Sequence, residues 1–260
     1  MKLDYATLIS PYPFYLQKIG GIKSPTLRDI WNPNVTYQGY QTYLALLLAT
    51  PQKYCEHAVP SIVEWYQTLS EQEKLNVNMM DIMVMDKALQ ISYCKMLNFF
   101  FEEDVVWSNE DNLFITYKDV DDNGQIIPIG LIHRNIFTDL CDIILQRCGI
   151  VRSDIDTDAS KVKNKRALEI LKKLQKGREK AAKTSVNDKD TELPKLITAV
   201  AVKSKSINFT NIWDLTLFQF YEQFKKEQIN VYFDISATQV AAYGNEKKTF
   251  KGNEWYIDNQ

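Results

Sequence analysis

The stretch DIMVMDKALQISYCKMLNFFF, residues 81–101, has the strongest helical periodicity in the chain. Its apolar side chains recur every three or four residues, which places them on one face of a helix. These side chains are Ile82, Met85, Leu89, Tyr93, Met96 and Phe100. We therefore predict a single helix over residues 81–101 with one buried face. A methionine-rich stripe fills ordinary cores and also lines some promiscuous binding grooves, so both interpretations stay open.

The sequence before this stretch also favours helices, after an irregular or extended start over residues 1–23. Thr26 and Asp29 have the spacing of a capping box, in which each residue bonds the other's backbone N–H. A longer helix is expected over residues 36–49, where apolar residues again follow a helical period. Pro60-Ser61 indicates the start of a further helix, with Ser61 and Glu64 as its capping box.

After residue 104 the pattern changes to short β-type runs. A turn signal at Asp121–Gly124 separates residues 113–117 from residues 126–132, which predicts a small antiparallel β element within 105–132. The segment from Asp119 also matches the first half of a calcium loop, but its twelfth position is Gly130 where a glutamate is required. A hairpin turn with Asp and Asn in left-handed conformations is therefore the better interpretation. A helix over 136–148 follows, ended by Gly149.

Residues 161–183 form the one strongly basic segment of the chain. Its candidate basic patch consists of Lys172, Lys173, Lys176 and Arg178. The segment contains no aromatic residue, so it offers no surface on which nucleic-acid bases would stack. Three interpretations stay open: a solvated helical spacer, a contact with an acidic protein, and a contact with phosphates.

The most aromatic stretch is NIWDLTLFQFYEQF, residues 211–224. Thr216 and Gln219 predict a helix start, and a second capping pair, Ser236 and Gln239, predicts a separate short segment further on. The aromatic residues form either the core of a C-terminal subdomain or a docking face, since aromatic anchors are common hot spots of interfaces. The candidate partner-binding residues are Trp213, Leu217, Phe220, Tyr221 and Phe224.

These patterns together predict an α+β fold that is mainly α. We expect a mainly helical region over residues 1–104 and, packed on it, a β-hairpin with a helix over 105–150. A basic helical linker over 151–191 would then lead to a C-terminal helical subdomain over 192–260.

Composition and motifs point away from catalysis. The chain has 260 residues and a net charge of −2, with no overall attraction to nucleic acid or acidic membranes. Its two histidines, His57 and His133, belong to no zinc-spaced set, and no phosphate-binding glycine loop occurs. No apolar run is long enough to span a membrane. We expect no enzyme activity, no metal, no cofactor and no membrane contact, and we expect reduced cysteines in a cytoplasmic protein.

Three segments resemble proteins from the tail-morphogenesis region of phages and prophages of Gram-positive hosts. They are LISPYPFYLQKIGGIKSPTLRDIW (8–31), ITYKDVDDNGQIIPIGLIHRNIF (115–137) and KSKSINFTNIWDLTLFQFYEQFKKEQ (203–228). The resemblance spans most of the chain and implies a tail assembly chaperone, acting in the host cytoplasm, that binds tape-measure and tail-tube proteins. It implies no catalytic residues. A structural tail or baseplate component of the virion and a nucleic-acid-binding accessory protein using residues 161–183 are the alternatives, and a homo-oligomer stays open.

Overall fold

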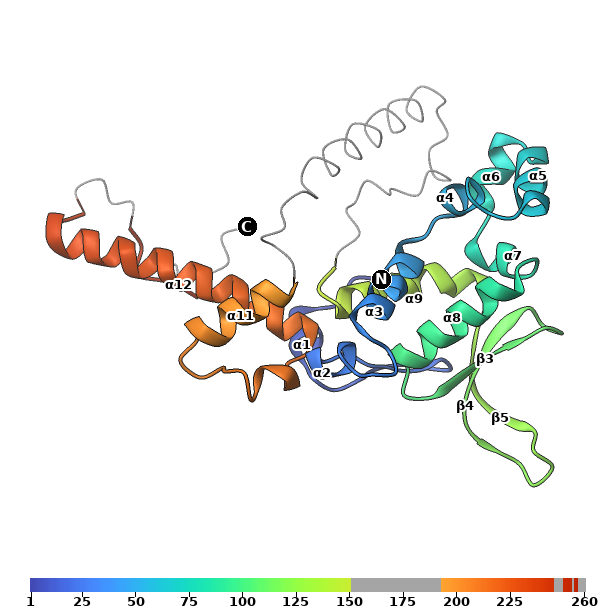
Figure 1. Ribbon diagram of the computed structural model, residues 1–260, viewed down its shortest axis with the longest axis horizontal. Helices are drawn as coiled ribbons and strands as arrows, with labels where there is room; N and C mark the ends of the chain where they lie inside the picture. Colours follow the sequence, from blue (N-terminus) through green and yellow to red (C-terminus); the bar gives the residue numbers. More distant parts are fainter. Residues whose placement is uncertain (151–192, 246–249, 254, 257–260) are drawn as a thin grey trace.

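The computed structural model describes residues 1–150, 193–245, 250–253 and 255–256, and Figure 1 shows how their elements are arranged. The fold is α+β and mainly α, as the sequence predicts. Helices α3, α8 and α9 lie together at the centre, the sheet lies beside α8, and α12 extends away from the body (Figure 1).

The first hundred residues are mostly helical. Their helices are α1 (Tyr5–Ile9), α2 (Leu27–Ile30), α3 (Tyr37–Leu48), α4 (Pro51–Cys55), α5 (Pro60–Thr68), α6 (Glu71–Asn76), α7 (Met79–Met83) and α8 (Lys87–Phe100). Residues 1–23 are more regular than expected, because α1 is followed by a two-stranded antiparallel ribbon of β1 (Phe14–Leu16) and β2 (Gly20–Ile22). The capping box of Thr26 and Asp29 forms at the start of α2, and α3 confirms the helix expected over 36–49.

The prediction of one helix over residues 81–101 is wrong, because the segment divides into α7 and α8. Helix α7 ends at Met83, and Asp86 caps α8: its carboxylate accepts hydrogen bonds from the backbone N–H of Leu89, at 3.0 Å, and from the hydroxyl of Tyr54, at 2.6 Å. The break turns Met85 outward, so that 43% of its surface is exposed, whereas the helical period places it in the buried stripe.

The capping box expected at Ser61 and Glu64 does not form. Helix α5 begins two residues earlier than a cap at Ser61 would give, with Val59 at the cap position and Pro60 in the first turn. Ser61 therefore lies inside the helix, where its side chain no longer has the position of a cap. Proline decided this boundary, since its fixed φ suits the first helical position and its missing N–H is not needed there.

The predicted β element is a three-stranded antiparallel sheet in the order β3 (Asp104–Ser108), β4 (Leu113–Val120) and β5 (Ile126–Ile132). The turn between β4 and β5 is held by the carboxylate of Asp121, which accepts from the backbone N–H groups of Asn123 and Gln125. Only Gly124 in this turn has a positive φ, of 78°. The left-handed Asp and Asn conformations expected there are therefore absent, since the glycine supplies the one residue that the turn needs.

Gly130 in β5 allows the ribbon of β1 and β2 to approach the sheet. A Cβ atom at this position would lie 2.4 Å from the carbonyl oxygen of Lys18. The backbone N–H of Leu131 donates to that oxygen, and the hydroxyl of Thr116 donates to the carbonyl of Ile19. The N-terminal ribbon is thereby joined to the sheet.

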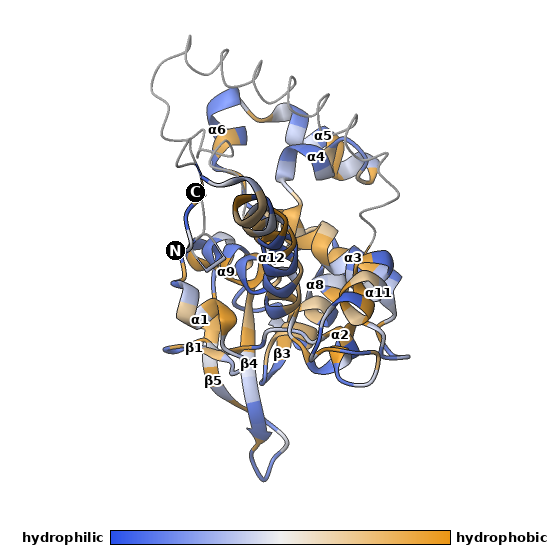
Figure 2. Cartoon of the chain, turned by 90° about the vertical axis from the view of Figure 1, so that its left-hand side faces the viewer, coloured by the Kyte–Doolittle hydropathy of each residue, from blue (hydrophilic) through white to orange (hydrophobic). Residues whose placement is uncertain are grey.

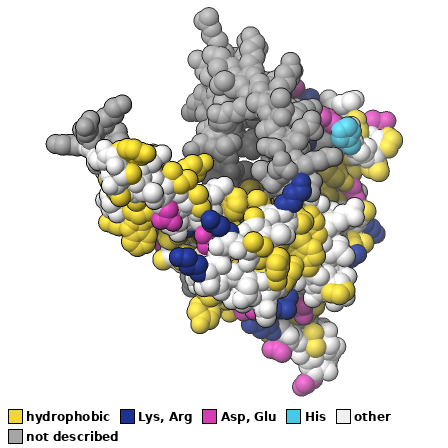
Figure 3. Space-filling model, turned by 60° about the vertical axis from the view of Figure 1, so that its left-hand side comes forward, with side chains coloured by type: hydrophobic (Ala, Val, Ile, Leu, Met, Phe, Trp, Pro, Cys, Tyr) yellow, Lys and Arg dark blue, Asp and Glu magenta, His cyan; other side chains and the backbone are white. Residues whose placement is uncertain are grey.

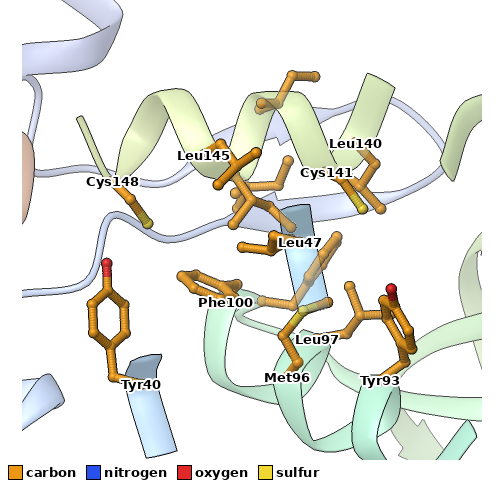
Figure 4. Packing of buried hydrophobic residues seen from close by; sticks show 14 of the residues in the cluster. Tyr40, Leu47, Tyr93, Met96, Leu97, Phe100, Leu140, Cys141, Leu145 and Cys148 are labelled. Carbon is orange, nitrogen blue, oxygen red and sulfur yellow. The ribbon is translucent and has the colours of Figure 1, made fainter. Parts of the chain in front are cut away.

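The core is one cluster in which α9 (Arg134–Arg147) packs against α3 and α8. Figure 4 shows Leu47, Phe100 and Leu145 meeting there, with the hydroxyl of Tyr40 directed toward the thiol of Cys148. Burial raises the pKa of Cys148 to about 12 and also raises the pKa of Tyr40. The same cluster includes Leu193, Ile197 and Phe220 from the C-terminal region. Helix α9 ends just before Gly149, whose φ of 75° is left-handed, as predicted.

Arg147 is fully buried and holds the N-terminal segment against α9. Its guanidinium donates to the carbonyl of Thr7, at 2.5 Å, and to the carbonyl of Tyr12, at 2.6 Å. Gln146 adds two bonds from the same turn, accepting from the N–H of Leu3 and donating to the carbonyl of Met1. Burial lowers the pKa of Arg147, but an arginine remains charged.

Candidate protein-binding surface on the C-terminal helix

Three elements form the C-terminal region: α11 (Leu193–Lys203), the 3-10 helix η3 (Ile212–Asp214) and α12 (Leu217–Tyr243). The predicted capping box of Thr216 and Gln219 forms at the start of α12. The separate segment expected near Ser236 does not, because no glycine or proline interrupts the sequence before Gly244. The result is one helix of 27 residues, about 40 Å long at 1.5 Å per residue.

The base of α12 is tied to the N-terminal region by backbone hydrogen bonds. Thr216 forms a β-bridge with Thr26. On either side of it, the N–H of Leu27 donates to the carbonyl of Leu215, at 3.0 Å, and the N–H of Leu217 donates to the carbonyl of Pro25, at 2.9 Å. The Gln219 side chain donates to the carbonyl of Ile9. Residues some 190 positions apart in sequence therefore hold the base of the helix in place.

The structure places the five candidate residues at this base and in η3. Leu217 and Phe220 are 1% and 0% exposed, so the chain itself covers them completely. Tyr221 lies against Gly149, and burial raises the pKa of its hydroxyl. Phe224 is half-buried against the core.

Trp213 also makes contacts within the chain. It packs edge-to-face on Trp31, with ring centroids 5.8 Å apart, and its indole N–H donates to the carbonyl of Phe209. Leu217 and Phe220 therefore offer no surface to a partner in this structure. For Trp213, Tyr221 and Phe224 an additional partner contact stays a prediction.

Beyond the base, α12 leaves the body of the molecule (Figure 1). We call residues 229–243 distal α12. No residue of this segment is buried, and large side chains are widely exposed: 73% for Tyr232, 51% for Ile235 and 86% for Tyr243. Figure 3 shows hydrophobic side chains gathered on this projecting end, and Figure 2, viewed from that side, shows hydrophobic and hydrophilic residues together around the helix.

Charge is unusually sparse in distal α12. Asp234 is its only charged residue, and the nine residues from Ile235 to Tyr243 contain none. Solvent-exposed helices ordinarily carry charged residues on their outer face. Within the described residues, the ring of Phe233 packs against the ring of Phe250, with centroids 5.3 Å apart. Among the residues that the structure describes, none buries the remaining apolar side chains of distal α12, and a partner molecule could cover them.

This surface was missed by the sequence reasoning, which expected the helix to stop before Ser236. The signal was present as the absence of charge after Asp234, together with the lack of any helix-breaking residue. A helix predicted as far as Gly244 would have included the exposed surface of distal α12.

The structure does not describe the predicted basic patch. The basic residues Lys172, Lys173, Lys176 and Arg178 lie outside the described residues. Within the described part of the chain, no three His, Cys, Asp or Glu side chains are grouped so as to hold a metal ion. No helix of that part has the length and hydropathy that crossing a membrane requires.

Comparisons with known proteins bear on the same region. No curated protein and no solved structure matches the chain. Residues 183–258 match the family model of the YomV second domain, a range that includes α11 and all of α12. YomV is associated with phages and prophages, so this similarity supports a phage-related protein.

Proposed function

We propose that this chain is an assembly factor of the tail-assembly-chaperone kind, which binds another phage protein through distal α12. The observation that carries the proposal is the projecting helix itself. Distal α12 exposes aromatic and aliphatic side chains and contains a single charged residue, Asp234. The similarity of residues 183–258 to a phage-associated domain supports the same setting.

The chemistry of the surface favours a helical partner. Tyr232 and Ile235 supply large apolar contacts of the type that dominates binding energies at interfaces. Ala242 lies about 20° around the helix from Ile235, at 100° per residue, and its small side chain allows a second helix to approach closely on that face. A long helical tape-measure protein with an uncharged apolar stripe fits these requirements. Covering that stripe would keep it from aggregating before the tail is built.

Co-expression with the tape-measure protein of the same phage or prophage tests the proposal. We expect the two chains to co-purify and the tape-measure protein to become more soluble. Ile235→Asp should weaken the complex at least tenfold, because it buries a carboxylate in an apolar contact. Asn230→Asp is the matched control: it adds the same charge at an exposed position about 140° around the helix, at 100° per residue, and should change little.

Two outcomes would contradict the proposal. Unchanged co-purification with Ile235→Asp would show that distal α12 is not the binding surface. The chain's presence in purified mature particles would favour a structural tail or baseplate component over a chaperone, since a chaperone leaves before the particle is complete. Mass measurement by light scattering separates a third case, in which distal α12 pairs with a second copy of the chain.

A further inference from the structure

The three-stranded sheet lies at the opposite end of the molecule from α12 (Figure 1), and the core covers one of its two faces. Side chains alternate between the faces of a sheet. On the inner face, Trp107, Phe114 and Ile132 are buried in the core cluster. The ribbon of β1 and β2 lies on that face too, because Thr116, which alternates with Phe114, bonds to the carbonyl of Ile19.

The other face, which we call the outer sheet face, is apolar as well. Its central row is Val106, Ile115 and Leu131, which are register partners across the three strands, with Tyr117 and Ile129 next to them. Leu131 and Ile129 are each 45% exposed, and Val106 and Ile115 are half-buried outside the core cluster. Antiparallel sheets usually place polar side chains on a face that meets water. An apolar row in this position is typical of a surface that another molecule covers.

The edges of the sheet are poorly suited to adding a further strand. At β3, the amide of Asn98 donates to the carbonyl of Val105 and accepts from its N–H. At β5, the N–H of Leu131 donates to the carbonyl of Lys18, and Pro128 has no N–H to offer. A partner would therefore contact the outer sheet face rather than extend the sheet.

The border of this face is acidic. Residues 104–133 contain one lysine, Lys118, which pairs with Glu103 at 3.6 Å. Asp104 alternates with Val106 and so borders the outer sheet face directly. The acidic residues of the range, most of them in or next to its two turns, are Asp104, Glu110, Asp111, Asp119, Asp121 and Asp122. Lys95 of α8, which lines a hollow together with Val106, is a basic exception on the α8 side.

We propose that the outer sheet face binds a basic amphipathic helix of a partner protein. The apolar stripe of that helix covers Ile115 and Leu131, and its lysines or arginines meet the acidic border, since complementary charge steers and selects a partner. Three strands about 4.8 Å apart present a face about 10 Å wide, close to the diameter of one helix. From Leu113 to Tyr117 the face is about 14 Å long, which matches about nine residues of a helix.

A contact of this size is at the weak end of specific interfaces, so we expect a micromolar Kd. It is independent of distal α12, and either binding surface can exist without the other.

Fluorescence anisotropy with two labelled peptides tests the proposal on the full chain. The first probe is a short amphipathic helix built from leucine and lysine, and the second has glutamate in place of every lysine. We expect the lysine probe to bind and the glutamate probe to bind at least tenfold more weakly, because the acidic border repels it. Added salt should weaken the binding of the lysine probe.

Variants of the chain locate the bound probe. Leu131→Ser removes apolar surface from the centre of the face without changing its charge, and should raise the Kd of the lysine probe about tenfold. Val202→Ser is the matched control, because Val202 is 72% exposed on α11, outside the sheet, and it should leave the Kd unchanged. Asp104→Asn should raise the Kd about two- to threefold at low salt. All three positions are on the surface, so thermal unfolding should show that the variants remain folded.

Several results would overturn the inference. Equal binding of the two probes, or binding of neither, would show that the face does not select a basic helix. An unchanged Kd in Leu131→Ser would exclude the outer sheet face, and a weaker Kd in Ile235→Ser would place the probe on distal α12 without affecting the proposed function. A dimer of the free chain that Leu131→Ser dissociates, measured by light scattering, would assign the face to a second copy.

Discussion

The two ends of α12 are similar in apolar content but differ in what surrounds them. At the base, Leu217 and Phe220 are covered by the N-terminal segment and by α9, and backbone hydrogen bonds from Leu27 and to Pro25 fix the helix there. In distal α12, Tyr232 and Ile235 stay exposed. The comparison teaches that an aromatic pattern alone does not mark a binding surface. An apolar pattern becomes a candidate binding surface only where other parts of the chain do not pack against it.

Truncation at the base should have the largest effect on stability. Phe220→Ala leaves a cavity in the core and should lower the free energy of unfolding by about 3–5 kcal/mol. Tyr232→Ala, in distal α12, should change it by less than about 0.5 kcal/mol, since exposed substitutions are nearly neutral. Urea unfolding of both variants measures the difference. Equal losses would mean that distal α12 is covered in solution.

Removing Arg147 should have the next largest effect. Arg147→Ala leaves the carbonyls of Thr7 and Tyr12 without their donors and creates a cavity, for an expected loss of about 3 kcal/mol. Because those bonds hold the N-terminal segment, amide hydrogen exchange over residues 3–12 should accelerate more than in distal α12. Acceleration confined to α9 would contradict this account of the segment.

Alkaline pH should weaken the core around the base. The pKa of Cys148 is raised from 9.0 to about 12 because burial disfavours the thiolate. A raised folded-state pKa contributes stability that is fully present below the unfolded value and is lost as the pH rises through the folded one. Stability should therefore fall between pH 9 and 12, by up to about 1.4 kcal/mol per pH unit for this group. Cys148→Ala should show a shallower fall in urea unfolding at pH 7.5 and 10.5.

The ion pair of Arg28 with Asp214 should contribute least. It joins α2 to η3 at 2.6 Å, but both side chains are about two-thirds exposed, at 63% and 66%. Arg28→Ala should cost less than about 1 kcal/mol, and the loss should shrink in high salt. Thermal unfolding at two salt concentrations checks this, and a larger, salt-independent loss would show that the base depends on charge rather than on packing.

The accuracy of the sequence-based predictions varied along the chain with the range of the interactions involved. The cap at Thr216, the hairpin turn at Asp121–Gly124 and the end of α9 at Gly149 are local features, and each was predictable from neighbouring residues. The break at Asp86 was missed, although its cap bond from the N–H of Leu89 is local; only the second bond to the Asp86 carboxylate comes from far away in sequence, from Tyr54, 32 positions distant.

The same distinction applies to the two parts of α12. Burial of Phe220 needs packing against the core cluster formed by distant residues, which no local pattern reveals. Distal α12 is different. Its length and lack of charge follow from consecutive residues in the sequence. They were missed because a separate segment was expected to begin near Ser236.

Hydrogen exchange of the chain, alone and in complex with the co-expressed tape-measure protein, tests the central claim most directly. We expect the amides of residues 229–243 to become protected in the complex, while those of the base, already covered, change little. A complex that forms without protection of residues 229–243 would contradict it.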